Sequence, residues 1–253
     1  MKKLFLLALC TIAPLALYAS DYDKDNSKGG VWGRKKYTNL SWVNQTLTDM
    51  NSPGNNFKSN FGGSIATGKT YYFHKKPILG LMKIGFDWTM IDINYAKYSD
   101  GNSLNSGIMT KSGDGFDDII TEDKPVTSFL TKDWGKNQVD LAMHFGASLT
   151  VNPVDFLKVK GYFRFAPTLS GIVSKGEGAD LEEMLLYGGY GSLWVSGIAV
   201  SYKVISLGIE RRWGNVNYRS ITAAEDISSF LGGTAHPMSI NSTRIYLGFQ
   251  LGK

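Results

Sequence analysis

Histidine is the residue type in this chain best suited to proton transfer, and the sequence contains His74, His144 and His236. Nucleophilic or acid–base catalysis by histidine needs a carboxylate or hydroxyl within hydrogen-bond reach. Asp140 precedes His144 by four residues, which is about 13 Å along an extended strand at about 3.3 Å per residue. A catalytic pair would therefore need a partner from another strand. The spacing around the three histidines matches no hydrolase motif, and we predict that the protein is not an enzyme.

A second set of residues carries charge on the polar face of segments whose other face is apolar. Such a face points into the closed interior of the structure that we predict, where isolated charges are costly and must pair. The set forms either a plug of ion pairs or a selective conduit in which basic residues favour anions, and we favour the plug. The predicted site residues are Lys83, Asp87, Asp140, His144, Lys158, Lys160, Arg164, Glu210, Arg212 and Arg244.

Metal and cofactor chemistry has little support in the sequence. The acidic run from Asp114 to Asp118 suggests calcium, but it lacks the ligand spacing and the closing glutamate of an EF-hand loop. We interpret it as part of a solvated acidic connection. The single cysteine, Cys10, lies in a segment that we expect to be removed, so the mature chain would have no thiol or disulfide. We predict no metal and no cofactor.

The first residues have the pattern of an export signal. Lys2 and Lys3 precede an apolar stretch that ends near Ala19, and a polar segment follows. We expect residues 1–19 to be a signal peptide and residues 20–253 to form one domain. Removal of Lys2 and Lys3 lowers the formal charge from +5 to +3, which is too small a bias to indicate a nucleic-acid partner.

The elements that position the charged residues are amphipathic strands. In the segment 138–151, apolar and polar residues alternate without a break, so that Leu141 and Phe145 fall on one face and Asp140 and His144 on the other. The apolar face is as long as the 9–11 residues with which a tilted strand crosses a bilayer. A two-faced strand of this length is typical of a membrane-spanning β-barrel.

Seven further segments resemble this strand. The predicted strands are 37–46, 61–74, 79–95, 137–151, 156–168, 192–203, 205–216 and 242–252. They are joined alternately by short turns, two of which contain Pro77 and Pro153, and by long connections at about 47–60, 96–136, 169–191 and 217–241. Short periplasmic turns and long external loops are typical of outer-membrane barrels. We predict an all-β, eight-stranded, antiparallel, up-and-down transmembrane barrel with four long external loops.

Two of those loops contain the pattern of a helix start. The capping boxes pair Asp180 with Glu183 and Thr222 with Glu225. Gly188 and Gly232 follow as candidate C-terminal stops. Helices here would either fold over the barrel mouth or form a surface that docks a partner, and the sequence does not choose between the two.

The alternation of the last segment, in which Ile245, Leu247 and Phe249 share one face, resembles the terminal strand of the small OmpA/OmpX-type outer-membrane barrels. The resemblance is one of architecture. It implies a multi-pass protein of the Gram-negative outer membrane that is exported through the periplasm and contacts the lipid bilayer and lipopolysaccharide. We predict a role in envelope structure, adhesion or binding of an extracellular protein or glycan through loops 96–136, 169–191 and 217–241. The alternatives are a narrow channel or small-ligand carrier, and a lipid A-modifying enzyme.

Overall fold

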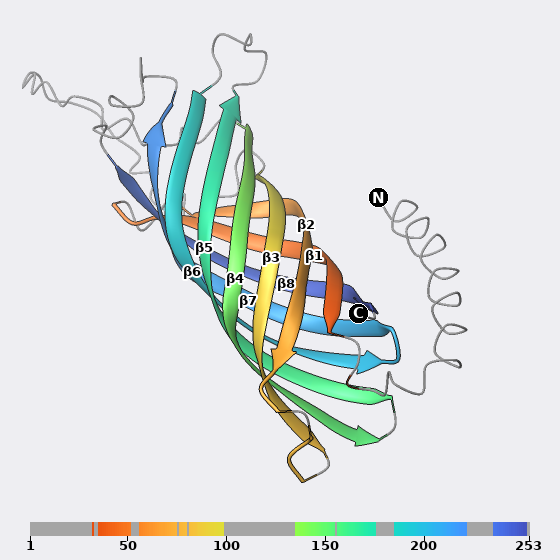
Figure 1. The fold of residues 1–253 in the computed structure, drawn as a ribbon. Coiled ribbons are helices and arrows are strands. Elements are labelled where there is room, and N and C mark those ends of the chain that lie inside the picture. The colour runs from red at the N-terminus through yellow and green to blue at the C-terminus, as the bar shows by residue number, and fades with distance from the viewer. Residues whose placement is uncertain are drawn as a thin grey trace, which may run out of the picture.

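The computed structural model describes residues 32, 35–51, 56–74, 76–79, 81–98, 135–154, 156–175, 185–221 and 235–251. These residues form a single closed barrel in which every strand pairs with the next in the chain (Figure 1). The strands are β1 (Lys36–Asp49), β2 (Asn56–Tyr72), β3 (Met82–Tyr98), β4 (Gly135–Val154), β5 (Leu157–Lys175), β6 (Leu185–Tyr202), β7 (Ile205–Ser220) and β8 (His236–Leu251). In the part of the chain just given, no helix is both long and apolar enough to cross a membrane.

The barrel is closed by an antiparallel pairing of the first and last strands. It runs without a break from Lys36 opposite Leu251 to Asp49 opposite Met238. Because closure pairs both edge strands, no row of backbone donors and acceptors is left open, as a spanning sheet in lipid requires. The predicted eight-stranded antiparallel up-and-down barrel is confirmed.

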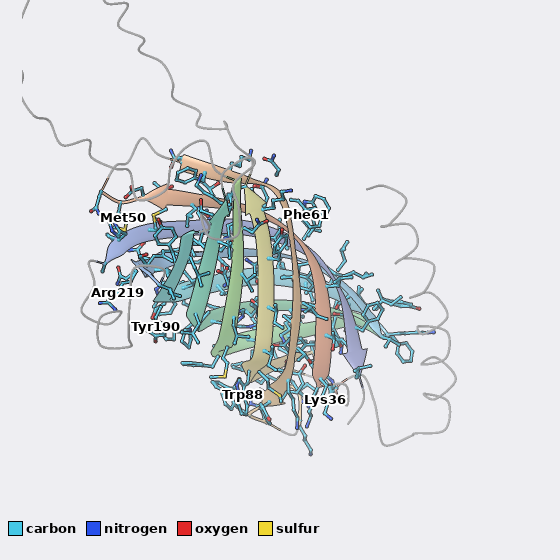
Figure 2. All side chains as sticks on the ribbon, turned by 90° about the horizontal axis from the view of Figure 1, so that it is seen from above. Lys36, Met50, Phe61, Trp88, Tyr190 and Arg219 are labelled. Carbon is cyan, nitrogen blue, oxygen red and sulfur yellow. The ribbon has the colours of Figure 1, made fainter. Side chains whose placement is uncertain are left out.

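The two ends of the barrel differ, and Figure 2 marks them with Lys36 at one end and Met50 and Arg219 at the other. The connections 155–156 and 203–204 lie at the end with Lys36, which we call the short-turn end. The connections 99–134, 176–184 and 221–235 lie at the opposite end, which we call the long-connection end. Both the start of β1 and the end of β8 lie at the short-turn end.

The strict alternation of short and long connections was wrong in one place. The β1–β2 connection comprises only residues 50–55, whereas the β2–β3 connection comprises residues 73–81. Strand β1 continues beyond its predicted end because Leu47 and Asp49 keep the inward alternation. Strand β2 begins at Asn56, before its predicted start at residue 61. At the other end, Leu79 adopts a left-handed conformation with φ of 52°, which interrupts the extended backbone before β3 begins.

Strand ends at the long-connection end also lie beyond the predicted limits. Strand β5 reaches Lys175, and β6 begins at Leu185 rather than at residue 192. Gly188 therefore lies within a strand and is not the stop of a helix that begins at Asp180. Residues 180–184, the capping box at Thr222 and Gly232 lie outside the described residues. Backbone pairing continues past the apolar part of each strand because the hydrogen bonds between strands join backbone groups, which polar residues also have.

The alternation of β4 appears in the structure as the sequence predicts. Leu141, Met143 and Phe145 are 41–52% exposed, whereas Asp140 and His144 are at most 1% exposed. The other strands also place large apolar side chains outside, as Trp88 and Tyr190 show in Figure 2. The exterior is therefore a wide apolar surface, and most buried polar residues face the lumen.

Tyrosine rings cover glycines on the inner wall at three cross-strand pairs. The pairs are Tyr37 with Gly68, Tyr162 with Gly197 and Tyr246 with Gly208. A Cβ atom at Gly197 would lie 2.4 Å from the Tyr162 hydroxyl, so each ring lies directly over the space that a side chain would fill. The missing side chain lets an aromatic ring lie against the wall, which is how aromatic residues compensate for glycine in sheets.

Candidate functional site

All ten charged or titratable residues predicted for the lumen are buried, with exposed fractions of 9% or less. Ion pairs join six of them into one connected system, with Arg212 at its edge. Lys158 lines a cavity together with Lys160 and Arg164, Lys83 lies over the rings of Trp32 and Tyr72, and Asp140 lies in another layer. We call the connected system the lumen network. It comprises Asp87, Asp92, His144, Lys160, Arg164, Glu210, Arg212 and Arg244.

Asp87 on β3 is the centre of the half of the network nearest the short-turn end. Its carboxylate accepts hydrogen bonds from Lys160 Nζ at 2.8 Å and from Arg164 Nη2 at 2.9 Å, both on β5 across the lumen. The hydroxyls of Thr70 and Ser148 donate at 2.7 and 3.1 Å. A buried carboxylate with two cations and two neutral donors is fully compensated for its loss of water.

Glu210 on β7 connects this half to the next. The Tyr162 hydroxyl donates to it at 3.0 Å, and Arg244 Nη1 donates at 3.3 Å. Arg164 lies 3.9 Å from the same carboxylate and stacks on the Tyr162 ring, with 3.7 Å between the guanidinium carbon and the ring centroid. Acidic and basic groups thus alternate from Lys160 to Arg244 across four strands.

Asp92 on β3 is the carboxylate that the sequence prediction missed. It accepts a hydrogen bond from Arg244 Nη1 at 2.8 Å, and His144 Nε2 lies 3.0 Å away without hydrogen-bond alignment. Arg212 Nη1 lies 3.8 Å away, and none of the three Arg212 guanidinium nitrogens has a hydrogen-bond partner among the described residues. Asp92 thereby collects three basic groups from β4, β7 and β8.

A register shift in β3 explains why Asp92 was missed. Met90 and Ile91 are both exposed, and the pairing with β4 shifts between Thr89 and Asp92. This irregularity is a β-bulge, which moves the following residues to the opposite face. The signal in the sequence is the adjacent apolar pair Met90–Ile91, after which the alternation resumes in the other phase.

Asp140 lies in a separate polar layer nearer the long-connection end. Its carboxylate accepts hydrogen bonds from Asn94, Gln138 and Ser170 at 2.6–2.9 Å, and none of its hydrogen bonds within the described part of the chain comes from a cation. Asp140 is thus bonded by neutral donors, and the opposite charge that acts on it, Arg244, does so without a hydrogen bond. The layer is completed by Gln45, Tyr98 and Tyr218.

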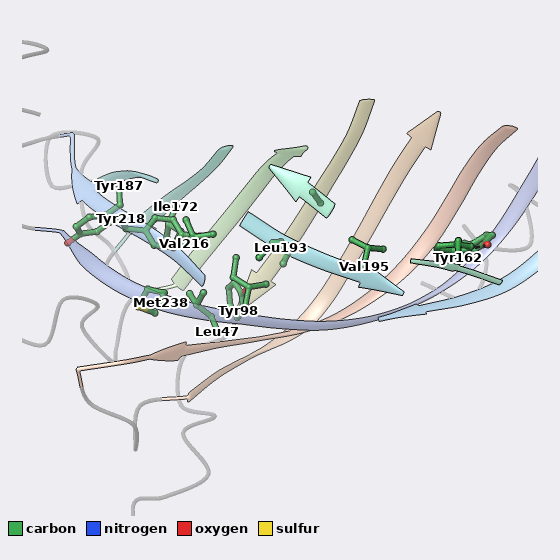
Figure 3. Packing of buried hydrophobic residues seen from close by; sticks show 14 of the residues in the cluster. Leu47, Tyr98, Tyr162, Ile172, Tyr187, Leu193, Val195, Val216, Tyr218 and Met238 are labelled. Atoms are coloured by element: carbon green, nitrogen blue, oxygen red, sulfur yellow. Dashed lines mark hydrogen bonds between the residues drawn. The ribbon is translucent and has the colours of Figure 1, made fainter. Parts of the chain in front are cut away.

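Beyond this layer a group of apolar side chains is buried in the lumen, which the sequence prediction did not foresee. Figure 3 draws the larger buried cluster to which the group belongs and labels Leu47, Ile172, Val216 and Met238. We call this group the apolar cap; its members, each 0% exposed, are Leu47, Ile172, Val216, Met238 and Ile240. They lie near the ends of β1, β5 and β7 and near the start of β8, in segments that lie beyond most of the lipid-facing pattern. The lumen is thus closed by ion pairs in its middle and by apolar packing at its long-connection end.

The structure places the three histidines apart, with His144 in the lumen, His74 near a short turn and His236 at the start of β8. The partner that His144 required from another strand is Asp92, but His144 is 1% exposed, and its ring nitrogens make no hydrogen bond with any described hydroxyl. His74 accepts a hydrogen bond from the Ile84 backbone N–H at 3.2 Å near a short turn. His236 was expected in a loop, but it is the first residue of β8. The acidic run from Asp114 to Asp118 lies outside the described residues.

Arg211 lies on the outer wall, as its place in the alternation predicts. No β-bulge turns this charge away from the lipid face, because the pairing of β7 with β6 and β8 continues through Arg211 without a register shift. Its cross-strand neighbours are Ser196 and Thr243. The outer wall therefore carries a polar spot above the apolar residues Leu207 and Ile209.

The fold and the filled lumen define the class: the architecture is that of the small eight-stranded outer-membrane barrels. No protein-family model matches the sequence, and no curated protein matches it.

Among solved structures, the chain resembles Neisserial surface protein A, NspA (10% identity, 85% of this chain and 97% of the other, TM-score 0.42). It also resembles Ail, the attachment invasion locus protein of Yersinia pestis (6% identity, 86% and 99%, TM-score 0.37), and the outer membrane enzyme PagL (10% identity, 83% and 99%, TM-score 0.29). At such low similarity, function has to be argued from the residues of the chain itself.

Proposed function

We propose that the protein resides in the outer membrane of a Gram-negative bacterium as a closed barrel that anchors and displays its external connections. In this proposal the connections act in envelope structure, adhesion or binding of an extracellular protein or glycan. The bilayer and lipopolysaccharide surround the wall, and the lumen network is a structural plug. The observation that carries the proposal is a lumen crossed in its middle by buried ion pairs, inside an apolar exterior.

The exterior supports membrane residence. Exposed leucine, isoleucine, phenylalanine and tryptophan side chains occur on all eight strands, for example Leu40, Ile65 and Ile198. A monomeric protein in water rarely exposes a contiguous apolar patch larger than a few hundred Å². Lipid is the solvent that such a wall matches.

The interior supports a closed barrel over a channel. The lumen network joins β3, β4, β5, β7 and β8 across the middle, and the apolar cap follows toward the long-connection end. A conduit would require a continuous polar path, which these side chains interrupt. His144, the histidine beside a lumen carboxylate, is 1% exposed, which favours a binding role over a lipid-modifying enzyme.

Planar-bilayer recording of refolded residues 20–253 tests closure. We expect no stable current from a barrel whose insertion is verified by its resistance to unfolding in unheated SDS. An open, salt-dependent current would overturn closure and favour the channel alternative. In that case Arg164→Gln should alter ion selectivity, whereas in a plugged barrel it should mainly lower stability.

Replacement of residues 99–134 by a short turn tests whether that external connection carries the adhesive function. We expect the shortened protein to remain heat-modifiable but to lose adhesion to host cells or matrix when it is produced on a non-adherent bacterium. Retained adhesion by a correctly inserted variant would contradict the assignment of function to that connection. The matched control is replacement of the short-turn segment 203–204 by Asn-Gly, which should leave adhesion unchanged.

A further inference from the structure

The short-turn end of the lumen contains a cavity that the plug does not fill. Its volume is about 30 Å³, which is room for about two water molecules or one small oxyanion group. Its wall combines residues near the starts of β1, β5 and β7 with residues near the ends of β2, β4, β6 and β8, among them Tyr72, Thr150, Ser201 and Gln250. Its position places it between the lumen network and the short turns.

The charged residues that line this cavity are all basic. They are Lys35, Lys36, Lys158, Lys160 and Arg164, and no described acidic residue lines it. Lys158 and Lys160 are 3% and 9% exposed, so their charges are held inside the barrel wall. Clustered charges of one sign inside a low-dielectric wall create a strong local potential.

The nearest carboxylate does not neutralise this group. Asp87 bonds Lys160 and Arg164, but it already accepts hydrogen bonds from Thr70 and Ser148 as well. Two carboxylates, Asp87 and Glu210, therefore lie beside five basic groups, and both contact Arg164. The amide oxygen of Gln250 accepts a hydrogen bond from Lys158 Nζ, which orients that ammonium group at the cavity.

Aromatic residues form the inner limit of the cavity. The Tyr162 ring stacks under the Arg164 guanidinium, and its hydroxyl lies 3.2 Å from that of Tyr246. Both tyrosines line the cavity. Beyond them lies Glu210, so an entering ion meets a closed wall and the network behind it. The cavity is a blind recess rather than the mouth of a channel.

We propose that this recess is a binding site for an oxyanion, a phosphate or carboxylate group, that enters from the short-turn end. Lysine ammonium groups and an arginine fork are the donors with which proteins bind such groups. The location of the opening rests on the proposed function: with the long connections outside the cell, the opening faces the periplasm. The binding itself does not depend on that orientation. The ion has two chemical sources, a free phosphate or the phosphate of an anionic lipid headgroup.

Titration calorimetry with inorganic phosphate tests the site. The refolded chain is placed in phosphatidylcholine nanodiscs, and we expect saturable binding of one ion per barrel that weakens as salt is raised. The double variant Lys35→Gln, Lys158→Gln should weaken binding at least tenfold. The matched control Lys69→Gln, Lys203→Gln removes two lysines at the same end whose ammonium groups lie over the rings of Tyr71 and Tyr202, and should change binding less than twofold.

A second nanodisc composition separates the two sources. If phosphate binding is lost in discs that contain phosphatidylglycerol, a lipid headgroup occupies the recess; if it persists, the site takes the free ion. Absence of saturable binding in phosphatidylcholine discs, or equal weakening by the control variant, overturns the proposal. Should the double variant not refold, Lys36→Gln, whose side chain is exposed, replaces it with an expected loss of about threefold.

Discussion

At the scale of single residues, the two central arginines differ in what they contribute. Arg244 donates to both Asp92 and Glu210, at 2.8 and 3.3 Å. Arg212 approaches only Asp92, at 3.8 Å, and makes no hydrogen bond with a described residue. Both side chains are almost completely buried. A buried cation without bonded partners stabilises little, whereas one that compensates two carboxylates is needed.

We therefore expect Arg244→Met to lower the free energy of unfolding by about 3–5 kcal/mol, because two buried carboxylates lose a cation. Arg212→Met should leave it unchanged or raise it, since Asp92 keeps Arg244 and His144. Urea titration of the barrel in lipid vesicles, followed by tryptophan fluorescence, measures both. A larger loss for Arg212→Met than for Arg244→Met would contradict the described connections.

Arg211 gives a second prediction at this scale. An outward arginine costs about 2–4 kcal/mol at the bilayer midplane and less toward the interfaces. Arg211→Leu should therefore stabilise the barrel in lipid by about 1–2 kcal/mol, a fraction of that cost because the side chain can reach toward the headgroups. The comparison is Lys97→Leu, at an exposed position of β3 near the long-connection end, where the gain in stability should be smaller. Destabilisation by Arg211→Leu would indicate that the arginine has a partner on the outer wall.

At the scale of elements, each tyrosine–glycine pair couples two neighbouring strands, because the ring on one strand occupies the space above the glycine on the other. A Cβ at Gly197 would lie 2.4 Å from the Tyr162 hydroxyl and 2.8 Å from the Ile209 carbonyl oxygen. Gly161, on the adjacent strand β5, has nothing within 4 Å of that position. We expect Gly197→Ala to displace Tyr162 from Glu210 and to cost about 1–3 kcal/mol.

Gly161→Ala is the matched control and should be neutral or slightly stabilising, because alanine reduces the freedom of the unfolded chain. Both variants are compared by the midpoint of the heat-induced mobility shift in SDS. Equal midpoints for the two alanine variants would show that the ring does not lie where the structure places it.

The sequence predicted the inward and outward residues of a strand best where the two-residue period continues through the whole strand. In β4 the two-residue period continues without interruption, so the positions of Asp140 and His144 followed directly from it. In β3 the extra residue at Met90 and Ile91 reverses the phase, and a fixed period assigns Asp92 to the wrong face. The apolar cap could not be predicted because strand limits were taken from the lipid-facing pattern, whereas backbone pairing extends beyond it.

At the scale of the whole molecule, the orientation of the barrel can be tested with thiols. The only cysteine is Cys10, in the expected signal peptide, so each introduced cysteine is a single label. Asn51→Cys lies at the long-connection end and Lys76→Cys at the short-turn end, and both positions are exposed. We expect a membrane-impermeant maleimide to label Asn51→Cys on intact cells and Lys76→Cys only after the outer membrane is opened. The reverse pattern would place the short turns outside.

The ion pairs that cross the lumen also bear on the time course of folding. Arg244 and Asp92 are 152 positions apart in the chain, and Lys160 and Asp87 are 73 apart. The first contact joins β3 to β8 and forms only when the barrel closes, whereas the second joins β3 to β5 and needs three consecutive strands. Contacts between distant positions slow folding. Interactions absent from the transition state mainly slow unfolding, so we expect a barrel that assembles late, opens rarely and persists in the membrane for far longer than its equilibrium stability alone would suggest.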